Sequence, residues 1–187
     1  KDKILSLYER EVRVIVRKKA GAEVEFGNTL LLGENPQGLI LDWELFKETA
    51  PADSRLQERS RERMKDGFGP VLKNVGADRG FHSEANQKAL AKDGVYDGVC
   101  PRSPQELKER GHSWKFKKLQ RRRAQTEGRV AIIKNVFLGR PLRSKGFEHR
   151  ALSVTWTVLT HNLWAMARLT IAAREAARAA QKAAMAA

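Results

Sequence analysis

The order of strand-forming and helix-forming segments constrains the fold of this chain more than any other feature. Residues 3–46 are dominated by short β-rich apolar runs, at residues 4–8, 12–17, 26–32 and 39–45. The last two runs flank Asn35-Pro36-Gln37-Gly38, a turn-forming stretch, and therefore predict a β-hairpin. The chain thus begins with three or four antiparallel strands.

Helices and short strands alternate after residue 50. Helices are predicted over residues 53–65, with Asp53 or Ser54 as N-cap, and over residues 84–92, with Ser83 as N-cap. The remaining segments read as strands at 71–77 and 95–99, a loop at 100–113, a basic helix at 115–136, a long helix at 147–174 and a frayed alanine tail. Strands followed by alternation predict an α/β fold, with a mixed sheet and helices on its faces. An RNase H-like fold has this order of elements.

Length and apolar content are enough for one domain with a real core. The chain has 187 residues, of which 41% are hydrophobic, and this is thin for two domains. We expect residues 1–146 to form the main domain, and residues 147–187 to add a C-terminal helix and tail that pack on it. Trp156 and Trp164 are expected to be packing residues of that helix. Because the chain begins with Lys1, we expect an N-terminal part to be missing.

Basic residues are concentrated in one part of the chain. Residues 101–150 hold 15 Lys and Arg against 4 Glu, a net charge of +11 within the +14 of the whole chain. Such a block predicts a polyanionic partner, and nucleic acid is the usual one. No apolar run reaches the roughly 18 residues of a membrane span. The single cysteine, Cys100, excludes an internal disulfide framework and a Cys-based zinc site, as is typical of a reducing cytoplasm.

One acidic residue of the basic helix stands between two cations. Arg123, Glu127 and Lys134 fall within about 40° of one another on an α-helix. Upstream, Asp78 follows the predicted strand at residues 71–77. Phosphodiester cutting and strand transfer use two divalent ions, one at the attacking and one at the leaving oxygen. Mg²⁺ or Mn²⁺ takes carboxylate oxygens, so Asp78 and Glu127 are candidate ligands for two such ions.

Several short sequence motifs in this chain resemble motifs of a known protein family. Three motifs resemble conserved motifs of DDE transposases from bacterial insertion sequences. They are Asp78-Arg79-Gly80-Phe81, the set of Arg123, Glu127 and Lys134, and His161-Asn162-Leu163-Trp164. The specific likeness is to the ISNCY-like group, and it is close over residues 21–28, 122–129 and 147–168. It covers nearly the whole chain apart from the alanine tail.

The resemblance implies a role for each matching position. Asp78 would be the second catalytic acid and metal ligand, and Glu127 the third. Related transposases carry Tyr-x2-Arg-x3-Glu-x6-Lys around the last acid, and here Gln120 stands at the Tyr position. Gln120 can still donate a hydrogen bond to a phosphate. The implied DNA-binding residues are Gln120, Arg121, Arg122, Arg123, Arg129, Lys134 and Arg143.

The first catalytic acid has three candidate positions. The resemblance places it at Asp2, before the first strand. Asp42 is the rival, but in an RNase H-like sheet its strand lies away from the site. The first acid can also precede Lys1.

Two functions of different classes follow from these observations. The first is a transposase that cleaves and joins DNA with metal ions, acting as a homo-oligomer in the bacterial cytoplasm at the nucleoid. The second is a catalytically incomplete remnant that only binds DNA. A related nuclease acting on RNA is a third option.

Overall fold

Two antiparallel hairpins open the molecule. The computed structural model describes residues 9, 11–19, 22–69, 72–139 and 142–186. Strand β1 (Arg13–Lys19) pairs with β2 (Ala22–Gly27), and β3 (Leu30–Glu34) pairs with β4 (Ile40–Leu45). The β3–β4 turn closes because the Asn35 side-chain oxygen accepts hydrogen bonds from the backbone N–H groups of Gln37 and Leu39, at 3.0 and 2.9 Å. This confirms the predicted second hairpin.

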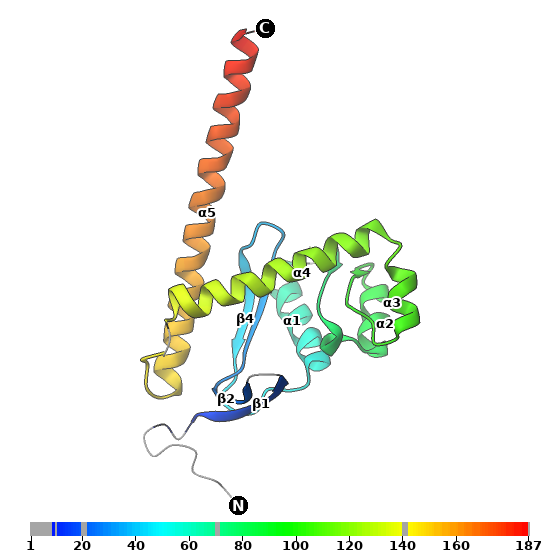
Figure 1. Ribbon diagram of the computed structural model, residues 1–187, viewed down its shortest axis with the longest axis vertical. Coiled ribbons are helices and arrows are strands. Elements are labelled where there is room, and N and C mark those ends of the chain that lie inside the picture. The colour runs from blue at the N-terminus through cyan, green and yellow to red at the C-terminus, as the bar shows by residue number, and fades with distance from the viewer. Residues whose placement is uncertain (1–8, 10, 20–21, 70–71, 140–141, 187) are drawn as a thin grey trace, which may run out of the picture.

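A helix-rich half follows the hairpins. Helix α1 (Asp53–Phe68) packs on β4 and on a 3₁₀ turn, η1 (Arg79–Phe81). Strand β5 (Asn74–Val75) runs parallel to β6 (Tyr96–Asp97), and α2 (Glu84–Lys92) connects them. Then come α3 (Pro104–Arg110) and α4 (Trp114–Ile132). Figure 1 shows α4 as a long diagonal helix, with α2 and α3 near its N-terminal end.

Two long helices meet at the core. A π-helical turn, η2 (Ile133–Phe137), extends α4, and α5 (Phe147–Ala186) packs on η2 and β4. At this junction a buried hydrophobic cluster is formed by Ile40, Ile133, Val154 and Val158. Asn162 locks α5 to the edge of β4, because its side chain both donates to the carbonyl and accepts from the N–H of Ile40, each at 2.8 Å. Asn162 therefore fastens α5 to β4.

Several predicted elements need correction. Residues 100–113 are not all loop, because Ser103 caps α3 and Pro104 occupies its first turn, where proline needs no hydrogen-bond partner. Neither Asp53 nor Ser54 is the N-cap of α1, since Ala52 holds that position without a side-chain bond. Ser83 does cap α2, as predicted, by accepting from the N–H of Asn86. The alanine tail continues α5 to Ala186, because alanine is the strongest helix former.

The long C-terminal helix also buries a different face from the expected one. Trp156 is 60% exposed, whereas His161 is fully buried, with its ring edge-on to Phe137 and tilted against Trp164. The long helix predicted from residue 147 is present, but it carries apolar residues on a buried face and also on an exposed one.

The architecture is a mixture of helices and strands, as predicted. Within the described residues, the strands form three separate two-stranded sheets rather than one mixed sheet. The predicted strand at residues 4–8 lies outside the described residues, and the division at residue 146 stays a prediction. None of the helices in the described part of the chain has the length and apolar character that crossing a bilayer requires.

Candidate nucleic-acid processing site

The carboxyl ends of β5 and β6 form a rigid platform. The N–H of Gly98 donates to the carbonyl of Val75 at 2.7 Å, and the N–H of Cys100 donates to that of Ala77 at 3.0 Å. Helix α4 is tied to this platform by Gln120, whose side-chain amide donates to the carbonyls of Gly98 and Ala77, at 2.7 and 3.4 Å. The main chain next to Asp78 is therefore fixed from two sides.

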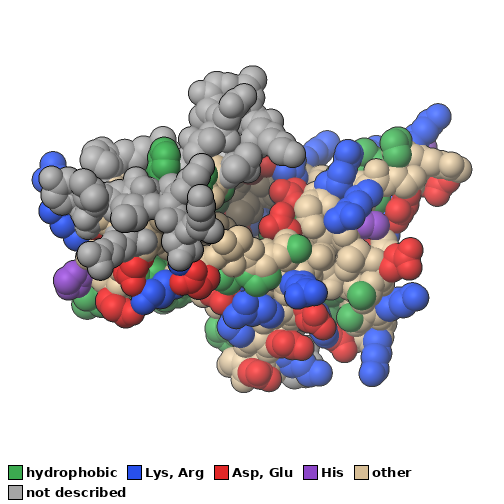
Figure 2. Space-filling view, turned by 90° about the horizontal axis from the view of Figure 1, so that it is seen from below, with side chains coloured by type: hydrophobic (Ala, Val, Ile, Leu, Met, Phe, Trp, Pro, Cys, Tyr) green, Lys and Arg blue, Asp and Glu red, His purple; other side chains and the backbone are tan. Residues whose placement is uncertain are grey.

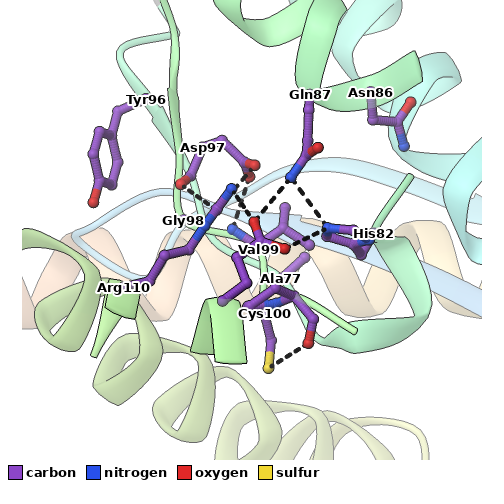
Figure 3. Close-up of polar contacts among 12 residues, drawn as sticks. Ala77, His82, Asn86, Gln87, Tyr96, Asp97, Gly98, Val99, Cys100 and Arg110 are labelled. Atoms are coloured by element: carbon purple, nitrogen blue, oxygen red, sulfur yellow. Dashed lines mark hydrogen bonds and ion pairs between the residues drawn. The ribbon is translucent and has the colours of Figure 1, made fainter. Parts of the chain in front are cut away.

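Polar side chains brace the same platform from α2 and α3. Arg110 donates to both the carbonyl and the carboxylate of Asp97, at 3.2 and 3.1 Å, and Asp97 accepts from the N–H of Val99. Figure 3 shows these contacts beside Gln87 and His82, whose side chains lie 3.1 Å apart. The network leaves Asp97 paired with Arg110, so we assign it a structural role.

Asp78 lies three residues after the end of β5 and is exposed. One of its carboxylate oxygens caps η1 by accepting from the N–H of Gly80 at 2.9 Å. A second carboxylate lies close by, because a Cβ added to Gly80 would overlap Asp53 Oδ2 and lie 3.1 Å from Asp78 Oδ1. The pKa of Asp53 is raised, first by burial and then by repulsion from Asp78. The sequence predicted Asp53 only as a helix cap. The sequence places Asp53 on the first turn of α1. Nothing in the local pattern indicates that this turn lies next to Asp78.

Glu127 lies on the same flank of α4 as Gln120. Seven residues separate them, which places Glu127 almost directly along the helix from Gln120, about 10 Å further on. Its carboxylate accepts from Arg123 Nη1 at 2.5 Å and is 66% exposed. We call this side, with Gln120, Arg123 and Glu127 on α4 and Lys134 on the following η2 turn, the α4 flank. It is fixed to the residue before Asp78 at one end and carries Glu127 two turns away.

The described residues do not assemble a complete metal centre. No group of three His, Cys, Asp or Glu side chains within them is placed to hold an ion. Asp2 lies outside the described residues. The rival first acid, Asp42, is only 6% exposed and binds Arg63 through both oxygens, at 2.7 and 2.9 Å. A carboxylate held in this way serves the β4–α1 packing.

Two of the predicted DNA-binding arginines are engaged inside the molecule. Arg129 pairs with Glu34, and Arg122 Nη2 lies 3.7 Å from the same carboxylate and donates to the carbonyl of Asn35 at 3.1 Å. Thr126 also donates to Glu34, at 2.8 Å. These contacts fasten α4 to the β3–β4 hairpin. Glu34 lies 88 to 95 residues from its arginine partners, so no local pattern could reveal the pairing.

Other cations remain turned toward solvent. Lys117, Lys118 and Arg121 are exposed on the outer side of α4, and Lys118 Nζ lies 4.9 Å from the ring centre of Trp114. Arg143 is exposed at the rim of a hollow beside α5, and Lys134 is half-buried. Figure 2 shows a different face, seen from below, where Lys and Arg are interspersed with Asp and Glu. The outer side of α4 is thus the best candidate for sequence-independent phosphate contacts.

Comparisons with known proteins found no relative of this chain. No protein-family model matches it, and no curated protein or solved structure matches it significantly.

Proposed function

We propose that this chain is the catalytic portion of a DDE transposase with an RNase H-like arrangement, which cleaves DNA strands and joins them to a target. One observation carries the proposal. Asp78 leaves the carboxyl end of a parallel strand pair, and Gln120 holds the flank of α4 that carries Glu127 against the same strand end. Active sites of open sheets form at carboxyl strand ends, where side chains from several elements converge.

The donor chemistry fits Mg²⁺ or Mn²⁺. Asp78 offers an exposed carboxylate with one oxygen outside the η1 cap, and the neighbouring carboxylate of Asp53 supplies further oxygen, the ligand type that these ions prefer. The raised pKa of Asp53 marks a place where negative charge is unfavourable without a cation. Asp78 and Glu127 would hold the ions, with Asp2 as the first acid. When bound, two such ions activate the attacking oxygen and stabilise the leaving one.

The chain's own residues then have separate tasks. Arg123 orients the Glu127 carboxylate by a hydrogen bond and reduces the repulsion between that acid and the DNA backbone. Lys117, Lys118 and Arg121 hold phosphates on the outer side of α4. Because these contacts are to the backbone, they position the strand without reading its sequence. A homo-oligomer acting at the bacterial nucleoid is part of the same proposal.

A DNA-binding remnant without catalysis is the second candidate. It is favoured by the pairing of Glu127 with Arg123 and by the lack of a three-carboxylate group among the described residues. In this case the exposed cations of α4 still bind DNA, but no strand is cut.

Metal-dependent nicking of supercoiled plasmid by the chain distinguishes the two candidates. Under the transposase proposal, the wild-type chain nicks the plasmid with Mg²⁺ or Mn²⁺, Glu127→Gln abolishes nicking, and DNA binding stays nearly intact. Glu109→Gln, on the exposed side of α3, is the matched control and should nick normally. Wild-type nicking by Glu127→Gln would refute the mechanism. Binding without nicking by the wild-type chain would favour the remnant.

A further inference from the structure

Helix α5 carries two apolar faces on opposite sides. The inner face, with Val154, Val158 and Ala165, is buried in the core. Leu163 is nine residues from Val154 and therefore lies about 180° around the helix. It belongs to a row whose members are between 46% and 60% exposed: Leu152, Trp156, Leu159, Leu163 and Met166. We call this row and its continuation toward the C-terminus the outer seam.

The outer seam has the spacing of a coiled coil. Its members follow one another at alternating steps of four and three residues, which is the 3.5-residue repeat of a and d positions. The same steps continue through the alanine-rich half of α5, at Thr170, Ala173, Ala177, Ala180 and Ala184. A strict repeat of this kind over more than four heptads indicates a partner helix in a left-handed coiled coil.

The C-terminal half of α5 stands without support from the body. Every residue from 166 to 185 is exposed, and Figure 1 shows this half projecting well beyond the other elements. Isolated helices are marginal in water even when rich in alanine, so most helical stability comes from packing of an apolar face. Leu169, next to Thr170 of the outer seam, is also exposed there, at 42%. A partner along the seam would supply the missing packing.

The seam is complementary to itself when reversed. It has a bulky half and a small half, and two antiparallel copies centred near residue 168 bring each large side chain against a small one. The layers would pair Leu152 with Ala184, Trp156 with Ala180, Leu159 with Ala177, Leu163 with Ala173, and Met166 with Thr170. Each contact occurs twice, as two-fold symmetry requires. A parallel pair would instead place Trp156 against itself and alanine against alanine, with poor packing at both ends.

Charge also favours the antiparallel arrangement. Beyond the centre of the outer seam, residues 169–186 carry Arg174, Arg178 and Lys182 against Glu175 alone. Antiparallel copies keep these two basic ends at opposite ends of the seam, whereas parallel copies would place them side by side. The seam is about 50 Å long and about 10 Å wide, so pairing would bury on the order of 1,000 Å² in total. Specific interfaces begin near about this area.

We propose that the outer seam of α5 is the docking surface for a second copy of this chain, in an antiparallel two-fold helix pair. The bodies lie on the inner faces of the two helices and so on opposite sides of the pair. The surface does not depend on metal binding or on DNA, and it stands independently of the proposed catalysis.

Sedimentation of the full chain across micromolar concentrations, without DNA, tests the dimer. We expect a monomer–dimer equilibrium that Leu163→Glu weakens by about a hundredfold or more, because each dimer would bury two carboxylates. Ile171→Glu is the matched control, since Ile171 is exposed to a similar extent but lies off the seam. Circular dichroism should show both variants folded, because both sites are exposed in one chain. A monomer at all concentrations, a dimer that needs DNA, or equal loss in both variants would overturn the proposal.

Disulfide cross-linking tests the orientation. In a Cys100→Ser background, Leu159→Cys combined with Ala177→Cys should link two copies, whereas Leu163→Cys alone should not. The two copies of residue 163 would be about 15 Å apart along an antiparallel pair. Efficient cross-linking of Leu163→Cys alone would show a parallel pair and overturn the proposed register.

Discussion

Gln120 donates its side-chain amide to the main-chain carbonyl of Gly98 at 2.7 Å, and this bond ties helix α4 to the end of the parallel strand pair. The same amide also donates to the carbonyl of Ala77, the residue before Asp78. One side chain therefore positions both the segment that carries Asp78 and the helix that carries Glu127. The resemblance to transposases predicted that Gln120 contacts phosphate. Its amide is committed to the platform instead, so its contribution to the site is positional.

Replacing Gln120 by Leu should loosen this attachment. The carbonyls of Gly98 and Ala77 would lose their donor, and we expect a loss of about 1 kcal/mol in unfolding free energy. Gln125→Leu is the control, because Gln125 is exposed on the outer side of α4. Urea unfolding of both variants measures the difference. Equal stabilities would mean that Gln120 does not hold the helix.

Removing the Glu34 carboxylate should damage the fold strongly. Its side chain is only 7% exposed and contacts Arg122, Arg129 and Thr126, so Glu34→Ala would leave two partly buried arginines without their carboxylate partner. We expect a loss of about 3 kcal/mol or more. Glu148→Ala, at an exposed site on the first turn of α5, should change stability little. Chemical denaturation gives both values, and a small effect of Glu34→Ala would contradict the role of Glu34 as the anchor of α4.

Exposed arginines of α4 and those that pair with Glu34 should differ in their effects on DNA binding and on stability. Arg121→Gln removes an exposed cation, so it should weaken DNA binding and reduce the slope of log K against log salt by about 0.9, without loss of stability. Arg129→Gln should lower the melting temperature, because it breaks the pairing with Glu34. Fluorescence titrations over a salt series and thermal melts measure the two effects. Arg178→Gln, on the far half of α5, controls for loss of charge, and the distinction fails if Arg121→Gln destabilises the chain as much as Arg129→Gln.

His161 should make stability depend on pH in the acid range. Burial lowers the pKa of its imidazole, so the folded state resists protonation that the unfolded state accepts. Stability is therefore full above the ordinary histidine pKa of about 6.5 and falls as the pH drops below it. His161→Phe, which keeps a ring against Phe137 and Trp164, should flatten this part of the profile. Unfolding free energies between neutral pH and pH 5 would test it, and an unchanged slope would contradict the assignment.

Asp53 should make stability depend on pH in the opposite direction to His161. Because its pKa is raised in the folded state, the folded chain holds the proton more tightly, and stability falls as the pH rises through the range between the unfolded and folded values. Asp53→Asn should remove this loss, and Mg²⁺ should offset it in the wild-type chain more than in the variant. NMR titration of the carboxyl group with and without Mg²⁺ is the direct readout. A pKa for Asp53 that is not raised would remove the argument for a strained carboxylate pair.

The sequence predicted features that are set locally. The Asn35 turn, the Ser83 cap and the placement of Asp78 after a strand all follow from residues within a few positions of one another. It failed at α3, where Pro104 indicated a loop although Ser103 and Pro104 together are a helix start.

Features that depend on distant partners could not be predicted. The Arg129 to Glu34 pair and the approach of Asp53 to Asp78 join elements far apart in the chain. A pattern of single residues carries no information about which arginine finds a buried partner. For this reason the sequence predicted DNA binding both for the exposed arginine of α4 and for those that pair with Glu34.

Soaking a crystal of the chain with Mn²⁺ tests the central claim most directly. We predict an anomalous peak for Mn²⁺ with carboxylate oxygens of Asp78 as ligands, at Mn–O distances of about 2.1 to 2.2 Å. Glu127 should turn away from Arg123 and toward the same pair of metal ions. A structure in which Mn²⁺ leaves Asp78 without a ligand, while Glu127 remains on Arg123 and faces away from the strand ends, would contradict the account.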